Sequence, residues 1–422
     1  MSDPFLRYLT VFKSRLGVLN LTLGVTGFVH QPDKSLLRKI QQCIEETVDL
    51  CLSDPGNAST FDYLREKRLL PDTLIKGSRK KRRYTGFSLS KDGDIWIARD
   101  RSGAGLSEIP IHKIDVWMSD PSIPSTIGVP TPDNVEEILE LALQLHLLAR
   151  SKNTWTSAAQ LVRAFREASS IKNPENPFLL GLEILPLLRQ IIAVDGLILR
   201  ELLRVIPDSE VVKRDELAGA FPEIVQKAVD ECRRLGAHVD FNTIQFLKLV
   251  KTTGERRAQQ SRGPGVLEHR LSPRLEWLVD FGYLSKEGLA KNGFEYWVLP
   301  GAKSLLRDLD TSVGDVRWAE AVVVSQWRTN PSWRHLRSTL EVTKSELSIF
   351  KAYKMLQKRV GPSSLIDVAF AAGILAADKP FDQSFTDIIQ FAQRTKGIEL
   401  SGGRYVRSPQ NIFISEEILK RT

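Results

Sequence analysis

Residues 269–284 read His269-Arg-Leu-Ser-Pro-Arg-Leu-Glu-Trp-Leu-Val-Asp-Phe-Gly-Tyr-Leu284. Apolar residues recur here at helical spacing, at Leu271, Leu275, Leu278 and Val279, which predicts a helix with one buried stripe. Gly282 follows that stripe, and glycine often ends a helix because it takes the left-handed conformation without steric cost. The stretch therefore predicts an amphipathic helix with a defined end, followed directly by an apolar strand.

The flanking sequence extends this unit in both directions. An amphipathic pattern before it predicts a helix over Thr243–Lys251. The sequence after it has the pattern strand, polar loop, strand, over Tyr283–Leu284, Lys286–Asn292 and Phe294–Leu299. Pro300-Gly301 then opens a further helix over Ala302–Leu309. The order is thus helix, helix, short strand, basic loop, strand.

This order resembles the winged helix-turn-helix family over about residues 243–309. Modules of that family place the second helix of the turn in the DNA major groove and lay the wing along phosphate or the minor groove. The resemblance implies that Arg270 and Arg274 face the groove and that Lys286 and Lys291 are wing contacts. Residues 243–307 carry 11 Lys and Arg against 6 Asp and Glu, which suits a polyanionic partner.

A second stretch, about residues 340–416, resembles the same family. Its expected helices are Lys344–Arg359, Ser363–Ala372 and Gln383–Lys396, and its expected strands are Ile398–Leu400 and Ile412–Ile414. In the third helix an apolar face contains Phe385, Ile388, Ile389 and Ala392, whereas Thr386, Gln390, Gln393 and Arg394 lie off it. Glutamine and arginine hydrogen-bond well to base edges. The resemblance implies base contacts from Gln390, Gln393 and Arg394, and wing contacts from Arg404 and Arg407.

The remainder of the chain predicts a mostly helical α+β protein with several domains. Residues 1–125 indicate a mixed α/β domain, with helices over Asp33–Leu52 and Phe61–Leu69 and a hairpin of Tyr84–Leu89 with Asp94–Arg99. A third strand is expected over Lys113–Met118. Residues 133–240 indicate a central helical domain after a proline-rich linker, 241–312 the first winged-helix module, and 317–422 the second. Within the central domain we expect helices over Asn134–Ala149, Trp155–Ala168, Phe178–Ile206 (interrupted near Asp195-Gly196), Asp215–Phe221 and Pro222–Leu235.

Charge favours a nucleic-acid partner. The formal net charge is +8, and residues 151–422 carry 39 Lys and Arg against 32 Asp and Glu, compared with 20 against 19 in residues 1–150. The cations Arg79, Lys80, Lys81, Arg82 and Arg83 precede the hairpin and could hold a phosphate backbone. The alternatives for this run are a solvated loop or a nuclear-localisation signal.

The cysteines and the apolar segments indicate an intracellular protein. Cys43, Cys51 and Cys232 form no CxxC pair, and their odd number argues against a disulfide framework. Leu16–Val29 is apolar but too short to cross a bilayer. We expect a cytoplasmic location in a bacterium, or a nuclear one in a eukaryote, and no membrane partner.

Three function classes follow from these patterns. The first is a non-enzymatic protein that binds double-stranded DNA, with other protein subunits as further partners if it serves a larger complex. The second is a scaffold or adaptor, for example in a bacterial defence or restriction complex, that uses the winged helices and the central helices for protein contacts. The long apolar stretch Phe178–Ile206 motivates it. The third is a metal-dependent nuclease built on Asp92, Asp94, Glu108 and Lys113, although the usual Glu-x-Lys dipeptide is missing. No other pattern predicts a catalytic, metal or cofactor site, so we expect none.

Overall fold

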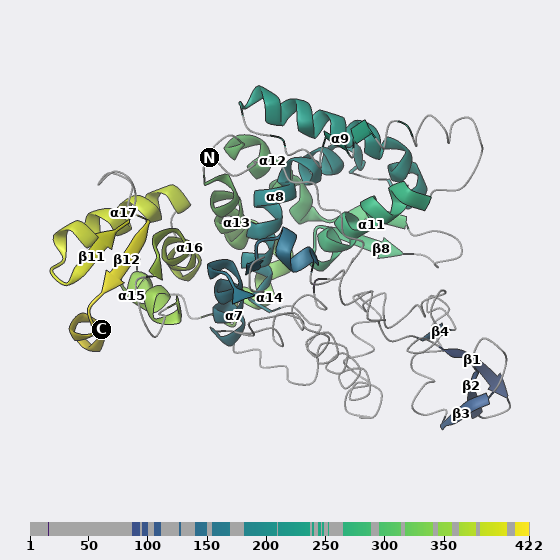
Figure 1. Ribbon diagram of the computed structural model, residues 1–422, viewed down its shortest axis with the longest axis horizontal. Coiled ribbons are helices and arrows are strands. Elements are labelled where there is room, and N and C mark those ends of the chain that lie inside the picture. Colours follow the sequence, from purple (N-terminus) through teal and green to yellow (C-terminus); the bar gives the residue numbers. More distant parts are fainter. Residues whose placement is uncertain are drawn as a thin grey trace. The chain divides into compact units, whose positions relative to one another are not determined.

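The computed structural model (Figure 1) describes a large part of the chain, mostly between residues 140 and 421. The described residues are 16, 87–92, 95–99, 105–110, 126–127, 140–149, 154–168, 181–208, 210–236, 239, 244–245, 247–248, 252, 265–287, 295–313, 317–340, 345–356, 363–376, 380–402 and 410–421. They belong to two compact units. The first contains residues 1–154, 173–180 and 201–299, and the second contains 155–172, 181–200 and 300–422. The central region 133–240 contributes to both.

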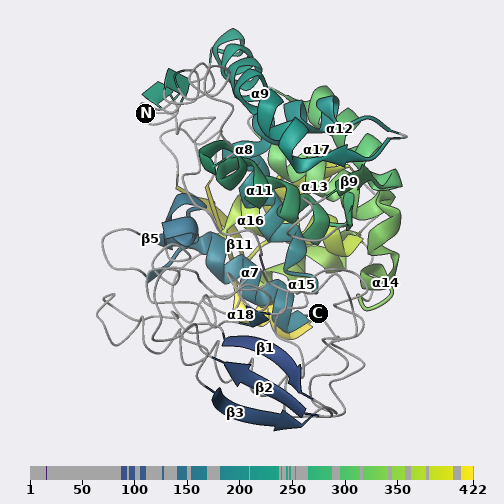
Figure 2. The ribbon, with the colours of Figure 1, turned by 90° about the vertical axis from the view of Figure 1, so that its right-hand side faces the viewer.

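A four-stranded antiparallel sheet lies in the first unit, with the strand order β3-β2-β1-β4. Figure 2 shows β1, β2 and β3 side by side. The strands are β1 (Phe87–Asp92), β2 (Ile95–Arg99), β3 (Gly105–Pro110) and β4 (Thr126–Ile127). Strands β1 and β2 pair as the hairpin that the sequence predicts, but β1 continues to Asp92, opposite Ile95, where we expected the first strand to end at Leu89. The strand that pairs with β2 is Gly105–Pro110, and the expected strand over Lys113–Met118 lies outside the described residues.

The first unit also contains a helix–sheet module around the 269–284 stretch. Its strands β7 (Val212–Lys213), β8 (Leu284–Glu287) and β9 (Glu295–Val298) form an antiparallel sheet of order β7-β9-β8. Its helices are α9 (Arg214–Arg234) and α11 (Gly265–Asp280), which pack together. Gly282 adopts φ +72°, which confirms that it ends α11. We call these five elements the first module.

A second helix–sheet module lies in the second unit (Figure 1). It consists of α15 (Ser345–Leu356), β10 (Ser363–Ser364), α16 (Leu365–Ala376), α17 (Phe381–Arg394), β11 (Ile398–Ser401) and β12 (Asn411–Ile414), followed by α18 (Glu416–Arg421). Its sheet is antiparallel in the order β10-β12-β11. Almost every side chain of α16 is buried, which places this helix at the centre of the module. Both modules are thus compatible with winged-helix-like architecture.

Helices outside the second module complete the second unit. They are α7 (Ser157–Ala168), the residues of α8 (Ile184–Val205) up to Arg200, α12 (Pro300–Ser312), α13 (Trp318–Thr329) and α14 (Arg334–Arg337), with a short 3-10 turn η2 at Pro331–Trp333. Helix α12 packs on α13, and α13 packs on both α16 and α17. The second module therefore rests on a helical base in its own unit.

Three expectations about the central helices were wrong. Helix α8 runs through Gly196 without a break, and the Trp318 ring packs so closely there that an added Cβ would lie 2.6 Å from it. Glycine thus permits close helix packing at this position. Helix α9 continues through Pro222, where we expected two helices. The helix expected to reach Ala149 ends near Gln144, because Leu148–Ala149 forms β5, which pairs with β6 (Thr154–Trp155).

A buried ion cluster connects three helices of the second unit. Arg189 of α8 donates from Nε to Glu320 of α13 over 2.7 Å and from Nη1 to Asp367 of α16 over 2.6 Å. All three side chains are buried. Burial alone would lower the pKa of Arg189, but Asp367 and Glu320 raise it above its ordinary value. This cluster fixes the helical base against the centre of the second module.

None of the described helices combines the length and the apolar character that a bilayer-spanning helix needs.

Candidate nucleic-acid interface

Helix α17 of the second module separates apolar and polar side chains onto opposite faces. Phe381, Phe385, Ile388 and Ala392 are buried, and the sequence predicted this face from the last three together with Ile389, which is half-buried. The exposed residues are Gln383, Thr386, Gln390, Gln393 and Arg394. Since successive residues of a helix are about 100° apart, these five fall within an arc of roughly 100° opposite the buried face. We call them the α17 polar face.

The chemistry of the α17 polar face suits base edges. A glutamine amide can bond adenine bidentately, and an arginine guanidinium can bond guanine in the same way. Asp387 lies at the edge of the arc and is half-buried. The structure therefore exposes Gln390, Gln393 and Arg394 as the sequence predicted, and it adds Gln383, which sequence reasoning did not select. Gln383 stands one turn before Thr386 and Asp387, so the helical period could have indicated it.

The paired strands β11 and β12 follow α17, and the end of β12 lies beside the turn that joins α17 to β11. Gly397, at φ +90°, makes the turn from α17 into β11, and its carbonyl accepts the Ser415 amide over 2.9 Å. Lys396, beside this turn, is exposed. Glu399 and Phe413 lie opposite each other on β11 and β12, and both are exposed. Arg404 and Arg407, the predicted wing contacts, lie outside the described residues.

The first module differs from the expectation, because α11 is enclosed. From Leu271 to Val279 only Ser272 is more than slightly exposed. Arg274 is 1% exposed, stacks its guanidinium on the Phe221 ring at 5.4 Å and donates to the Arg270 carbonyl over 2.6 Å. The prediction that Arg274 faces a groove is therefore corrected, since its long-range packing on α9 places it in the core. Arg270 is half-buried.

Lys286 is also buried. Its Nζ lies 2.6 Å from Oε1 of Glu276, and the Tyr296 hydroxyl donates to the same oxygen over 2.8 Å. Both charged side chains are less than a tenth exposed. The prediction that Lys286 contacts DNA from a wing is corrected: it neutralises a carboxylate inside the first module.

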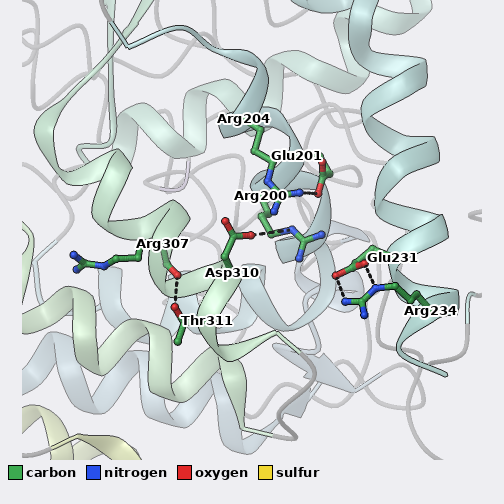
Figure 3. Close-up of polar contacts among 8 residues, drawn as sticks. All are labelled: Arg200, Glu201, Arg204, Glu231, Arg234, Arg307, Asp310 and Thr311. Carbon is green, nitrogen blue, oxygen red and sulfur yellow. Dashed lines mark hydrogen bonds and ion pairs between the residues drawn. The ribbon is translucent and has the colours of Figure 1, made fainter.

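The outer surface of α9 carries charges that are matched locally. Arg234 makes two hydrogen bonds to Glu231 (Figure 3), and Lys227 pairs with Glu223 at 2.8 Å. The hydrogen bond from Lys227 lowers the pKa of Glu223. On the buried side, Cys232 is fully covered, and this burial raises the pKa of its thiol to about 11. The outer surface of α9 therefore carries paired charges, whereas its thiol lies in the core.

The remaining candidate residues lie outside the described part of the chain or have no described side chain. The first group contains Arg79, Lys80, Lys81, Arg82, Arg83, Lys291, Asp94 and Lys113. The second contains Asp92 and Glu108, which stand on β1 and β3. Among the described side chains, no group of three or more His, Cys, Asp or Glu could hold a metal ion.

Comparison with protein-family profiles, with curated proteins and with solved structures gave no match.

Proposed function

We propose that the chain binds double-stranded DNA without enzymatic activity, and that the second module acts as a winged helix with α17 in the major groove. The observation that carries this proposal is the α17 polar face, which is exposed along the side opposite the buried stripe. A helix fits the major groove, where base edges present distinct donors and acceptors. The hairpin of β11 and β12 occupies the position of a wing.

The first module has a structural role in this proposal. Its α11 corresponds to a recognition helix in element order, but the burial of Arg274 and Glu276 leaves few side chains for a groove. The scaffold alternative was motivated by the apolar Phe178–Ile206 segment. Between Ile184 and Arg200 its large aliphatic side chains are buried within the chain, so they need no partner to cover them.

The experiment is a pair of matched variants in a duplex-binding assay. Labelled duplexes selected from a randomised pool are titrated by fluorescence anisotropy. Gln390→Ala with Arg394→Ala is expected to weaken binding about thirtyfold or more, because the variant removes two base contacts and each bidentate contact contributes about 1–3 kcal/mol. The control is Gln226→Ala with Arg234→Ala on α9. It removes the same two residue types as the α17 variant and changes the net charge by the same amount.

The control is expected to bind as the wild-type chain does. If no duplex is selected, or if both variants weaken binding equally, the proposal is overturned. Thermal unfolding of the variants, followed by circular dichroism, should match that of the wild-type chain, because the side chains removed in the α17 variant are exposed.

A further inference from the structure

Four exposed cations lie in the same unit as α17, on α12, α13 and α14. They are Lys303 and Arg307, one turn apart on α12, Arg328 at the end of α13 and Arg334 at the start of α14. We call these four residues the α12–α14 basic surface. The sequence did not indicate it, because the residues are spread over three helices.

Polar contacts hold these helix ends together. The Ser304 and Thr329 hydroxyls lie 3.2 Å apart, Gln326 donates to Ser304 over 3.1 Å, and Arg307 donates to Ser304 over 3.3 Å. Arg337 then joins α14 to the end of α13, since its Nη1 donates to the carbonyls of Trp327 at 2.6 Å and Asn330 at 2.9 Å. The cations are therefore carried by a rigid support.

The charges of the three arginines on this surface are only partly balanced by described carboxylates. No described carboxylate forms an ion pair with Arg328 or Arg334. Partial burial and the neighbouring Arg334 both lower the pKa of Arg337. Asp308 lies 3.6 Å from Arg307 but is mostly covered and accepts a hydrogen bond from Gln326 over 2.7 Å. Figure 3 shows the Arg307 guanidinium pointing away from Asp310.

The position of Arg328 relates this surface to the second module. Its neighbour Trp327 donates from the indole nitrogen to the Ile374 carbonyl over 3.0 Å. Ile374 lies in the last turn of α16, two residues before that helix ends and seven before α17 begins. The end of α13 is thus joined to the last turn of α16, the helix that precedes the proposed recognition helix.

We propose that the α12–α14 basic surface is a second contact of the chain with the phosphate backbone of the same duplex, which extends its footprint beyond the groove occupied by α17. This inference rests on the proposed function. Exposed guanidinium groups whose charge is incompletely paired bind phosphate oxygens well. Contacts to phosphate position a protein on a duplex without reading its sequence.

The test measures how affinity depends on salt for duplexes of two lengths. The chain is titrated against duplexes of about one and about three helical turns (roughly 10 and 30 bp) over a salt series. For Arg328→Ala with Arg334→Ala, the slope of log affinity against log salt on the longer duplex is expected to fall by about 2, since each lost phosphate contact removes about 0.9. On the shorter duplex the slope should remain that of the wild-type chain.

Two further variants serve as controls. Arg328→Lys with Arg334→Lys keeps both charges and should retain the slope. Arg163→Ala with Arg234→Ala removes two exposed arginines that are paired with Glu167 and Glu231, so it has the same net charge and should also retain it. If Arg328→Ala with Arg334→Ala keeps the wild-type salt slope on the longer duplex, this inference alone is overturned. If the chain binds neither duplex, or if the α17 variant binds as tightly as the wild-type chain, the proposed function is overturned as well.

Discussion

Replacing Arg189 by methionine is expected to lower the free energy of unfolding of the second unit by about 3–5 kcal/mol, the usual cost of leaving a buried charge without its partner. Arg189 neutralises both Glu320 and Asp367, and its guanidinium lies 5.2 Å from the centre of the Phe370 ring. Methionine retains the apolar stem of the side chain but leaves two carboxylates buried close together. Hydrogen exchange of the α13 and α16 amides measures this loss in the second unit.

The triple variant Arg189→Met, Glu320→Gln, Asp367→Asn is expected to recover much of the loss, because no buried charge remains. Arg163→Met provides the control, since its pair with Glu167 is exposed and should contribute no more than about 0.5 kcal/mol. If Arg189→Met unfolds like the wild-type chain, the ion cluster does not stabilise the second unit in the way described.

Replacing Lys286 by methionine is expected to destabilise the first unit by a similar amount, about 3–5 kcal/mol. The substitution removes the Lys286 ammonium group from the buried Glu276 carboxylate, which also accepts a hydrogen bond from the Tyr296 hydroxyl. Hydrogen exchange of the α11 amides measures the effect, and adding Glu276→Gln should reverse most of it. Lys227→Met, in an exposed pair with Glu223, should have little effect.

This variant also decides between the two roles considered for Lys286. A buried structural lysine should leave the salt dependence of duplex binding unchanged in the folded fraction. A decrease of about 1 in the slope would instead show that Lys286 contacts phosphate, as the sequence first indicated.

The sequence predicted the second module closely, because local periodicity determines it. The positions of Phe385, Ile388 and Ala392 define the buried face of α17, and they thereby place Gln390, Gln393 and Arg394 on the outside. The strands β7 and β10 could not be predicted in this way. Each is two residues long, which is too short for an alternating pattern, and their pairing partners are distant in sequence.

The predictions for the first module failed where partners are far apart in the sequence. Arg274 packs on Phe221, 53 positions earlier, and nothing in the periodicity of α11 indicates that contact. Lys286 was expected to contact DNA, yet in the structure it neutralises the buried Glu276 carboxylate of α11. Gly196 and Pro222 were read as helix breakers, but α8 and α9 continue through them, and at Gly196 the Trp318 ring packs against the helix.

The most direct measurement of the central claim is photocrosslinking from α17 to duplex DNA. The photoreactive residue p-benzoylphenylalanine is incorporated in place of Gln390 or, as a control, in place of Gln226 on α9. Irradiation with a labelled duplex should crosslink the chain that carries the probe at Gln390, and should leave the control uncrosslinked. If the probe at Gln390 gives no crosslink while the chain binds the duplex, α17 is not the helix that contacts DNA.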